Sequence, residues 1–259
     1  MEDTEEMKPA IVKRDGLAIQ YFGNPSEKMK LAAVKNNGLA IRYISNPSEK
    51  MKLAAVKNNG LALRFIKNPS EEMKFAAVKQ DGDAINYISN PTEEMELIAV
   101  NGNGLAIQYI NNPSEKISFV AVWRDGRAIQ FIKNPSEELK LAAVKQDGYA
   151  IKFISNPSEK IKLAAVKQNG YIIDRIKNPT EEMKLAAVHQ IGHAISYIVN
   201  ASKEVQLASL WDPTARKYVK YGLELPTIYY KWIHDCPEKY FKKNLKNRTK
   251  KYLDINIRC

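Results

Sequence analysis

The sequence predicts an all-α fold, specifically an α-solenoid of 22-residue repeats with two helices each. Three observations predict this fold. An Asn-Pro pair recurs every 22 residues, at Asn24, Asn46, Asn68, Asn90, Asn112, Asn134, Asn156 and Asn178. Gly keeps the same spacing from Gly16 to Gly192, and Ala keeps it from Ala33 to Ala187. A fixed period of this length is typical of solenoid proteins.

The first helix of each repeat is expected to begin at the Asn-Pro pair. In residues 46–67, Asn46 is a favourable N-cap and Pro47 suits the first helical position. Glu49 would then lie at the third position, near the positive end of the helix. The Asn-Gly pair that ends at Gly60 predicts the helix end, with the glycine in a left-handed conformation. We therefore expect a first helix of about 11–12 residues.

The second helix is expected in the six residues after each of these glycines. In residues 61–66, the apolar Ala62, Leu63 and Ile66 follow a helical spacing. The next Asn-Pro pair ends the helix, because a proline disfavours the α conformation of the residue before it. Prolines every 22 residues also exclude one long coiled coil. The alanine column that begins at Ala33 predicts close contact between helices.

The chain divides into residues 2–210, a solenoid of about nine and a half repeats, and residues 211–259, a helical C-terminal cap. Residues 200–210 resemble the first helix of a tenth repeat, without its glycine or second helix. From Trp211 the composition becomes aromatic and basic. We expect cap helices from the Asp212-Pro213 pair to about Tyr221, over residues 226–234 and over residues 237–245.

Repeats five and six depart from the common pattern. Asn101-Gly102-Asn103-Gly104 carries a second glycine, which predicts a looser turn between the two helices. Trp123 and Arg124 replace the Lys and the Asn or Gln of most other repeats.

Charge and cysteine content indicate an intracellular protein. The net charge is +11, of which residues 211–259 contribute +7 (12 Lys/Arg against 5 Asp/Glu). The two cysteines, Cys236 and Cys259, form no disulfide framework. The acidic start MEDTEE is unlike a signal peptide, and no apolar run reaches the ~18–20 residues of a membrane span. The expected location is therefore inside a cell.

A polar row is the first candidate binding surface. The fourth residue after each repeat glycine is polar in all nine repeats, so we expect it to face solvent. The first residue after the glycine would lie beside it. From these two positions the candidate binding residues are Gln20, Arg42, Arg64, Asn86, Gln108, Gln130 and Lys152, with Tyr149 and Tyr171.

Two functions compete with an ordinary solvated face for this row. The leading one is a non-catalytic scaffold that binds a protein partner of unknown identity. The alternative is a nucleic-acid-binding array, because Gln, Asn and Arg can hydrogen-bond base edges and Tyr can stack on bases. Acidic residues such as Asp174 oppose that alternative, since they repel phosphates.

A basic segment near the C-terminus is the second candidate. Its residues, interleaved with aromatic side chains, are Lys239, Lys242, Lys243, Lys246, Arg248, Lys250 and Lys251. Such a segment can bind a phosphate backbone. The competing interpretation is a capping helix whose basic face aids solubility.

The sequence predicts no enzyme, no metal site and no cofactor. His189 and His193 lie near one helix end without a paired Cys, Asp or Glu pattern. Cys236 lies close to His234, but no third partner completes a nucleophile. The repeat glycines end helices and do not follow a strand, so they make no phosphate-binding loop.

The motifs LAAVKNNG (residues 31–38), LAAVKQDG (141–148) and LAAVKQNG (163–170) carry a family resemblance. Over residues 2–199 the chain resembles the AVKQNG-type helical-repeat family, a domain of unknown function. That family occurs in amoeba-infecting giant viruses and amoeba-dwelling bacteria. The resemblance implies a viral or intracellular-parasite protein that acts in the cytoplasm or nucleus of a host cell, or in a virion. It supplies no functional residues.

Overall fold

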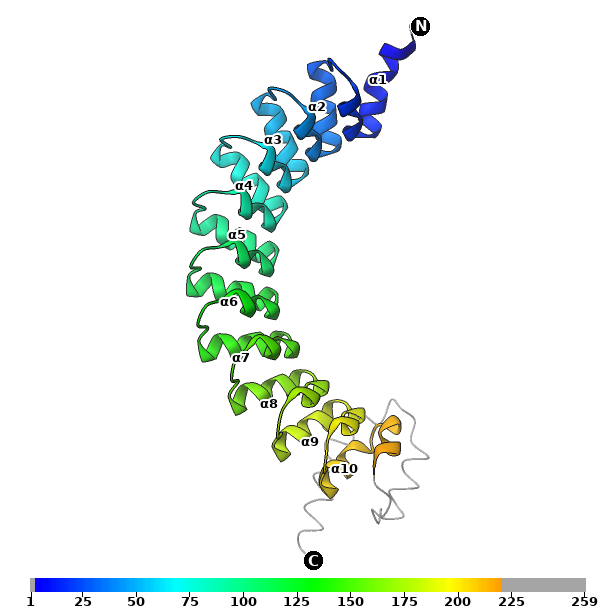
Figure 1. Ribbon diagram of the computed structural model, residues 1–259, viewed down its shortest axis with the longest axis vertical. Coiled ribbons are helices and arrows are strands. Elements are labelled where there is room, and N and C mark those ends of the chain that lie inside the picture. Colours follow the sequence, from blue (N-terminus) through cyan, green and yellow to red (C-terminus); the bar gives the residue numbers. More distant parts are fainter. Residues whose placement is uncertain (1–2, 220–259) are drawn as a thin grey trace, which may run out of the picture. The chain divides into compact units, whose positions relative to one another are not determined.

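The computed structural model describes residues 3–219, and within this range each repeat holds one α-helix followed by one 3-10 helix (Figure 1). The elements are α1 (Asp3–Arg14), η1 (Gly16–Tyr21), α2 (Glu27–Asn36), η2 (Gly38–Tyr43), α3 (Glu49–Asn58), η3 (Gly60–Phe65), α4 (Glu71–Gln80), η4 (Gly82–Tyr87), α5 (Glu93–Gly102), η5 (Gly104–Tyr109), α6 (Glu115–Arg124), η6 (Gly126–Phe131), α7 (Glu137–Gln146), η7 (Gly148–Phe153), α8 (Glu159–Gln168), η8 (Gly170–Arg175), α9 (Glu181–Gln190), η9 (Gly192–Tyr197), α10 (Lys203–Ser209) and η10 (Pro213–Tyr218). The fold is an α-solenoid, as the sequence predicts. The second helix of each repeat is of the 3-10 type.

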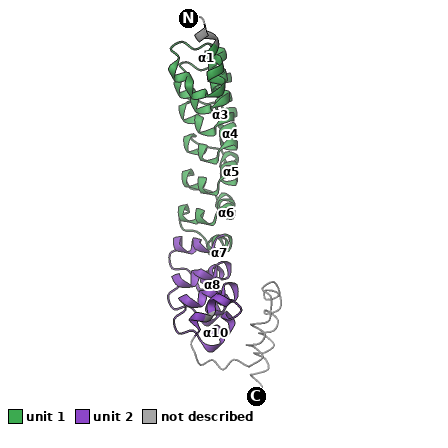
Figure 2. Ribbon diagram, turned by 90° about the vertical axis from the view of Figure 1, so that its right-hand side faces the viewer, with its two compact units in different colours: residues 1–146 green, residues 147–259 purple. Residues whose placement is uncertain are grey.

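The chain forms two compact units, residues 1–146 and residues 147–259 (Figure 2). Within each unit, consecutive α-helices pack against one another and make one layer. In unit 1, for example, α3 packs against α4. The 3-10 helices η1 to η6, η8 and η9 each pack against the α-helix of their own repeat and that of the next, as η3 does with α3 and α4. The 3-10 helices make the second layer.

The α-helices begin two residues later than the sequence predicts. Ser48, not Asn46, is the N-cap of α3, and its Oγ accepts a hydrogen bond of 3.4 Å from the N–H of Met51. Asn46 adopts a left-handed conformation with φ of 50°, which Asn tolerates better than most residues. The Asn-Pro pair therefore marks the turn that precedes the helix. Glu49 is the first helical residue instead of the third, and α3 has 10 residues instead of 11–12.

The same cap recurs along the chain. A Ser or Thr hydroxyl accepts the backbone hydrogen bond of the residue three positions later at Ser26, Ser48, Ser70, Thr92, Ser114, Ser136, Ser158, Thr180 and Ser202. Ser and Thr are favourable N-caps because the hydroxyl satisfies an otherwise unpaired N–H.

The repeat glycines are required by close packing and not by a left-handed backbone, so that prediction is wrong. The repeat glycines Gly16, Gly38, Gly60, Gly82, Gly104, Gly148, Gly170 and Gly192 all have φ outside the left-handed range. Instead, a Cβ atom added to Gly82 would lie 2.5 Å from the carbonyl oxygen of Ala99 in the next α-helix. Gly104 has the same relation to Ala121, also at 2.5 Å. The glycine lets one 3-10 helix touch the backbone of the following repeat.

The core consists of the columns that the sequence identifies as apolar. Every alanine of the column from Ala33 to Ala187 has 0 % of its surface exposed, which confirms the predicted close helix contact. Two further columns with the 22-residue spacing are also buried. The Met29 column runs from Met29 to Met183 in the α-helices, and the Ile41 column runs from Ile19 to Ile195 in the 3-10 helices. In most of the 3-10 helices the residue three positions after the Ile41 column, such as Ile44, is buried as well.

A side-chain amide that the sequence analysis overlooked joins neighbouring repeats. Oδ1 of Asn58 accepts a 2.6 Å hydrogen bond from the N–H of Gly38, and its Nδ2 donates a 3.0 Å bond to the carbonyl of Lys35. We call such an Asn or Gln an amide clamp. The clamp residues that accept from a glycine N–H are Asn36, Asn58, Gln80, Gln146, Gln168 and Gln190.

Repeats five and six have no amide clamp, because Gly102 and Arg124 occupy the clamp position. The second glycine does not loosen the turn as predicted. α5 keeps the 10-residue length, and Asn103 caps η5 by accepting a 3.0 Å hydrogen bond from the N–H of Leu105.

The tenth repeat has a second helix, contrary to the prediction of a half-repeat that lacks one. The helix predicted from Pro213 is present, but it is the 3-10 helix η10, which ends at Tyr218 and packs against η9. Asp212 caps it by accepting a 2.9 Å hydrogen bond from the N–H of Thr214. It also accepts a 3.0 Å bond from the N–H of His193 in η9. The helices predicted over residues 226–234 and 237–245 lie outside the described residues.

Candidate interaction surface

The local structure of the 3-10 helices decides where the candidate residues point. In η3, Oδ1 of Asn59 accepts a 3.0 Å hydrogen bond from the N–H of Leu61 and so caps the start. A 3-10 helix has three residues per turn, so residues three apart lie above one another. Leu63 and Ile66 share the edge that faces the core, with 2 % and 8 % of their surfaces exposed. Leu61 and Arg64 share another edge, which reaches the surface.

The polar row that the sequence predicts reaches solvent. In unit 1 its members are all exposed: Gln20, Arg42, Arg64, Asn86, Gln108 and Gln130. In unit 2, Lys152 and Asp174 are exposed, whereas Ser196 is half-buried. The prediction of a solvent-facing position is confirmed at all of these residues except Ser196.

An aromatic row, which was not among the predicted binding residues, lies directly beside the polar row. In unit 1 it consists of the fifth residue after each repeat glycine: Tyr21, Tyr43, Phe65, Tyr87, Tyr109 and Phe131. Phe65 is half-buried, and the others expose between 36 % (Tyr43) and 80 % (Tyr21) of their surfaces. The spacing of Ile41 and Ile44, three residues apart, is the sequence signal for a 3-10 helix that would have predicted this exposure.

Cationic members of the polar row stack on the aromatic row. The guanidinium carbon of Arg42 lies 4.5 Å from the ring centre of Tyr43, and that of Arg64 lies 4.5 Å from the ring centre of Phe65. In unit 2, Nζ of Lys152 lies 4.6 Å from the ring centre of Phe153. Each pair presents a positive charge and an aromatic ring as one surface element.

In unit 2, the 3-10 layer carries a group of aromatic side chains. Tyr149 and Tyr171 expose 40 % and 38 % of their surfaces. Tyr171 makes an edge-to-face contact with Tyr197, with ring centres 6.0 Å apart. His193 contacts both Tyr197 at 6.5 Å and Tyr218 at 5.1 Å. Edge-to-face packing of this kind is favourable for aromatic pairs.

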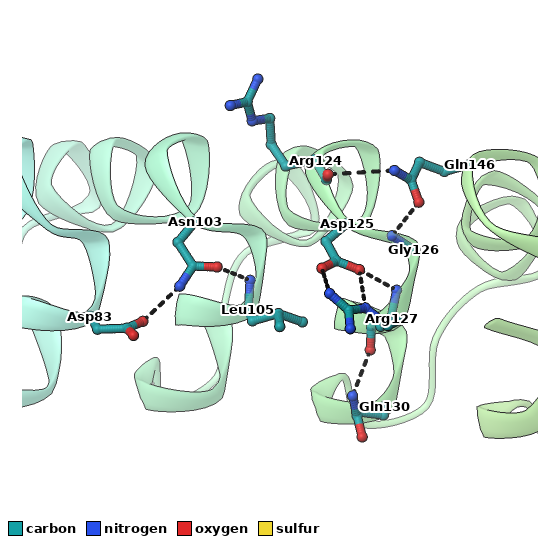
Figure 3. Close-up of polar contacts among 9 residues, drawn as sticks. All are labelled: Asp83, Asn103, Leu105, Arg124, Asp125, Gly126, Arg127, Gln130 and Gln146. Carbon is teal, nitrogen blue, oxygen red and sulfur yellow. Dashed lines mark hydrogen bonds and ion pairs between the residues drawn. The ribbon is translucent and has the colours of Figure 1, made fainter. Parts of the chain in front are cut away.

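Charged residues, Asp83 and Arg127, replace the leucine that follows the repeat glycine in two 3-10 helices of unit 1 (Figure 3). Asp83 accepts a 2.9 Å hydrogen bond from Nδ2 of Asn103. Burial raises the pKa of Asp83, the nearby Asp81 raises it further, and the Asn103 hydrogen bond lowers it. Two repeats later, the hydrogen bond from Arg127 holds the pKa of Asp125 below its usual value. The two guanidinium–carboxylate bonds, 2.7 and 3.0 Å long, fix Arg127 over its own helix cap.

The basic candidates near the C-terminus, from Lys239 to Lys251, lie outside the described residues. Among the helices of residues 3–219, none is long and apolar enough to cross a membrane. The same part of the chain has no cluster of three His, Cys, Asp or Glu side chains that could hold a metal ion.

Comparison of the chain with protein-family models, with curated proteins and with solved structures finds no match. The fold therefore defines the class of the protein, an α-solenoid with an exposed polar and aromatic 3-10 layer.

Proposed function

We propose that the chain is a non-catalytic scaffold that binds a protein partner along its 3-10 layer. The observation that carries this proposal is the aromatic row beside the polar row. Aromatic side chains and Arg are enriched in protein interfaces, and a few of them supply most of the binding energy. Single exposed apolar residues need no explanation, but a row repeated at every 3-10 helix of unit 1 is unusual for a free surface.

The pattern of variation supports the same function. The core columns keep nearly the same residue in each repeat, whereas the position after the repeat glycine changes from Leu61 to Asp83 and Arg127. Stacked repeats form extended binding surfaces, and substitutions at exposed positions change the chemistry without changing the fold.

Nucleic-acid binding is the second candidate function, and the stacked pairs favour it. Arg42 with Tyr43 and Arg64 with Phe65 combine a charge for phosphate with a ring on which a base can stack. Asp83 and Asp174 oppose it, because they place negative charge on the same layer. We therefore rank it below protein binding.

Selection of a random peptide library against the immobilised full chain tests the leading proposal. We expect enriched peptides whose binding weakens at least about tenfold in the double variant Arg42→Glu/Arg64→Glu. The matched control, Lys28→Glu/Lys50→Glu, makes the same charge change at exposed positions of α2 and α3. Peptides that bind both variants equally, or the absence of any enrichment, would contradict the proposal.

Fluorescence anisotropy with labelled single-stranded RNA and DNA tests the second candidate. Binding that weakens by decades between low and moderate salt would favour it, because phosphate contacts release counterions. The triple variant Lys242→Glu/Lys243→Glu/Lys246→Glu then separates a contribution of the basic segment from one of the polar row.

The biological setting that we propose rests on the resemblance of the repeat to the AVKQNG-type family. In that setting the chain is a viral or parasite protein that acts in the cytoplasm or nucleus of a host cell, or in a virion. Its protein partner would then come from the host or from the virus.

A further inference from the structure

The outer surface of the α-helix layer, on the side away from the 3-10 helices, has a defined set of positions. On α3 and α4 it forms a shallow groove of about 640 Å³, lined by Lys57, Glu72, Phe75, Ala76, Lys79 and Gln80. The ion pair between Lys57 and Glu72, at 3.4 Å, spans this groove. Because the repeats share one geometry, the equivalent positions of the other α-helices of unit 1 also lie on this surface.

α5 and α6 differ from the other repeats at these outer positions. Ile98 and Val120 replace the alanine of the other helices, and Asn101 and Trp123 replace a lysine. Trp123 exposes 69 % of its surface. Among the described residues, its ring stacks with the guanidinium of Arg124. Two adjacent helices thus have less charge and more apolar surface than the other α-helices. Such a patch is typical of an interaction site.

The outer surface of α5 is complementary to that of α6. At one exposed position, which is Lys or Glu in each of α2 to α9, α5 has Glu94 and α6 has Lys116, and neither has an ion-pair partner among the described residues. At the next position Ile98 corresponds to Val120, and both are half-buried. At the helix end, Gly102 leaves open space, with nothing within 4 Å of a Cβ atom added to it.

We propose that this surface binds a second copy of the chain, with α5 of one copy against α6 of the other. A two-fold axis parallel to the two helices and between them brings equivalent positions of α5 and α6 face to face. An interface around such an axis is isologous, so each contact occurs twice. A different protein would not require α5 and α6 to be complementary to each other.

The symmetry gives three paired contacts. Glu94 faces Lys116 of the second copy, so opposite charges meet at both edges of the contact. Ile98 faces Val120 of the second copy and forms the apolar centre. Trp123 packs over the C-terminal end of α5 of the second copy, beside Asn101. Gly102 has no side chain there, which leaves room for the indole ring.

The dimer is expected to be weak. The contact involves two short helices from each copy. The area that it buries is therefore smaller than the roughly 800 Å² per partner of a standard interface. The same axis would bring Glu72 of α4 opposite Glu138 of α7, and like charges oppose an extension of the contact beyond α5 and α6. We therefore expect a dissociation constant on the order of 10–100 μM.

Sedimentation equilibrium of the full chain over a concentration series tests this proposal. We expect reversible dimerisation that Glu94→Lys and Lys116→Glu each weaken at least about tenfold. The double variant Glu94→Lys/Lys116→Glu should restore dimerisation, because opposite charges again face each other. Trp123→Lys introduces the residue of most other repeats, so it should keep the fold and weaken the dimer.

Two controls make the result specific. Lys50→Glu changes the equivalent exposed position of α3 and should leave dimerisation unchanged. Arg64→Glu, on the 3-10 layer, should also leave dimerisation unchanged. The test of the dimer is therefore independent of the test of partner binding along the 3-10 layer. A monomer at all concentrations, a dimer insensitive to these variants, or a double variant without recovery would each overturn the proposal.

Discussion

The N–H of Gly38 donates a 2.6 Å hydrogen bond to Oδ1 of Asn58, which lies 20 residues later in the next repeat. Nδ2 of the same Asn58 donates a 3.0 Å bond to the carbonyl of Lys35 at the end of the preceding α-helix. One amide thus satisfies a backbone donor and a backbone acceptor that the ends of short helices leave unpaired. Where it is present, this clamp ties a repeat to its predecessor by polar bonds in addition to apolar packing.

Removing this amide should destabilise the stack. Asn58→Ala leaves the buried N–H of Gly38 without a partner, which should lower the free energy of unfolding by about 1–3 kcal/mol. Urea denaturation followed by circular dichroism measures the change, and hydrogen exchange at Gly38 should become faster. Asn101→Ala is the control, since it makes the same substitution at an exposed position of α5. An equal loss in both variants would argue against the clamp.

Adding an amide where it is missing should stabilise the chain. Gly102→Gln introduces the residue that Gln80 and Gln146 provide elsewhere, so it can accept a hydrogen bond from the N–H of Gly82. We expect a gain of about 2 kcal/mol, of which about 1 comes from helix propensity and about 1 from the hydrogen bond. Gly102→Ala should give only the propensity part. Equal unfolding free energies for the two variants would show that no clamp forms.

Substitution of a repeat glycine should be costly for steric reasons. In Gly82→Ala the added Cβ atom would lie 2.5 Å from the carbonyl oxygen of Ala99, so the two repeats must move apart. We expect a loss of about 1–3 kcal/mol in unfolding free energy. Gly102→Ala is the matched control, because its Cβ atom meets nothing within 4 Å. Thermal unfolding of both variants should shift in opposite directions.

The periodicity of the sequence was enough to predict the architecture. Spacings of 22 residues for Asn-Pro, Gly and Ala define the repeat, and the buried alanine column from Ala33 to Ala187 confirms the close helix contact. The solvent-facing polar row was also predictable, because one polar position among apolar neighbours must lie outside the core. These inferences need only burial and period, not the details of the backbone.

The capping details could not be predicted, because two residue types compete for each role. Asn46 and Ser48 are both good N-caps, and the structure assigns the cap to Ser48. Its Oγ accepts the hydrogen bond from Met51, whereas Asn46 has a left-handed φ of 50°. Likewise, Gly60 suits either a left-handed stop or a close approach, and the structure shows the second. The aromatic row was missed because an α-helical period was assumed where the chain forms a 3-10 helix.

The first turn of α5 carries an unbalanced charge that other α-helices neutralise. In α2, α3, α4 and α8 a Glu at the first position pairs with a Lys three residues later, as Glu27 does with Lys30 at 2.9 Å. In α5 the second residue of this pair is Glu96, which lies near Glu93. Burial raises the pKa of Glu96 above the ordinary 4.5, and the charge of Glu93 raises it further.

This raised pKa predicts a specific dependence of stability on pH. The folded chain holds the proton of Glu96 more tightly than the unfolded chain, so the stability that protonation confers is present below pH 4.5. It is lost as the pH rises through the raised pKa of the folded state. Glu96→Gln removes the charge, so its stabilising effect should be larger at about pH 7 than at about pH 4. Glu94→Gln, at an exposed position of the same helix, is the control. Thermal unfolding at both pH values measures the difference. A Glu96→Gln effect on stability that does not change with pH would contradict the raised pKa of Glu96.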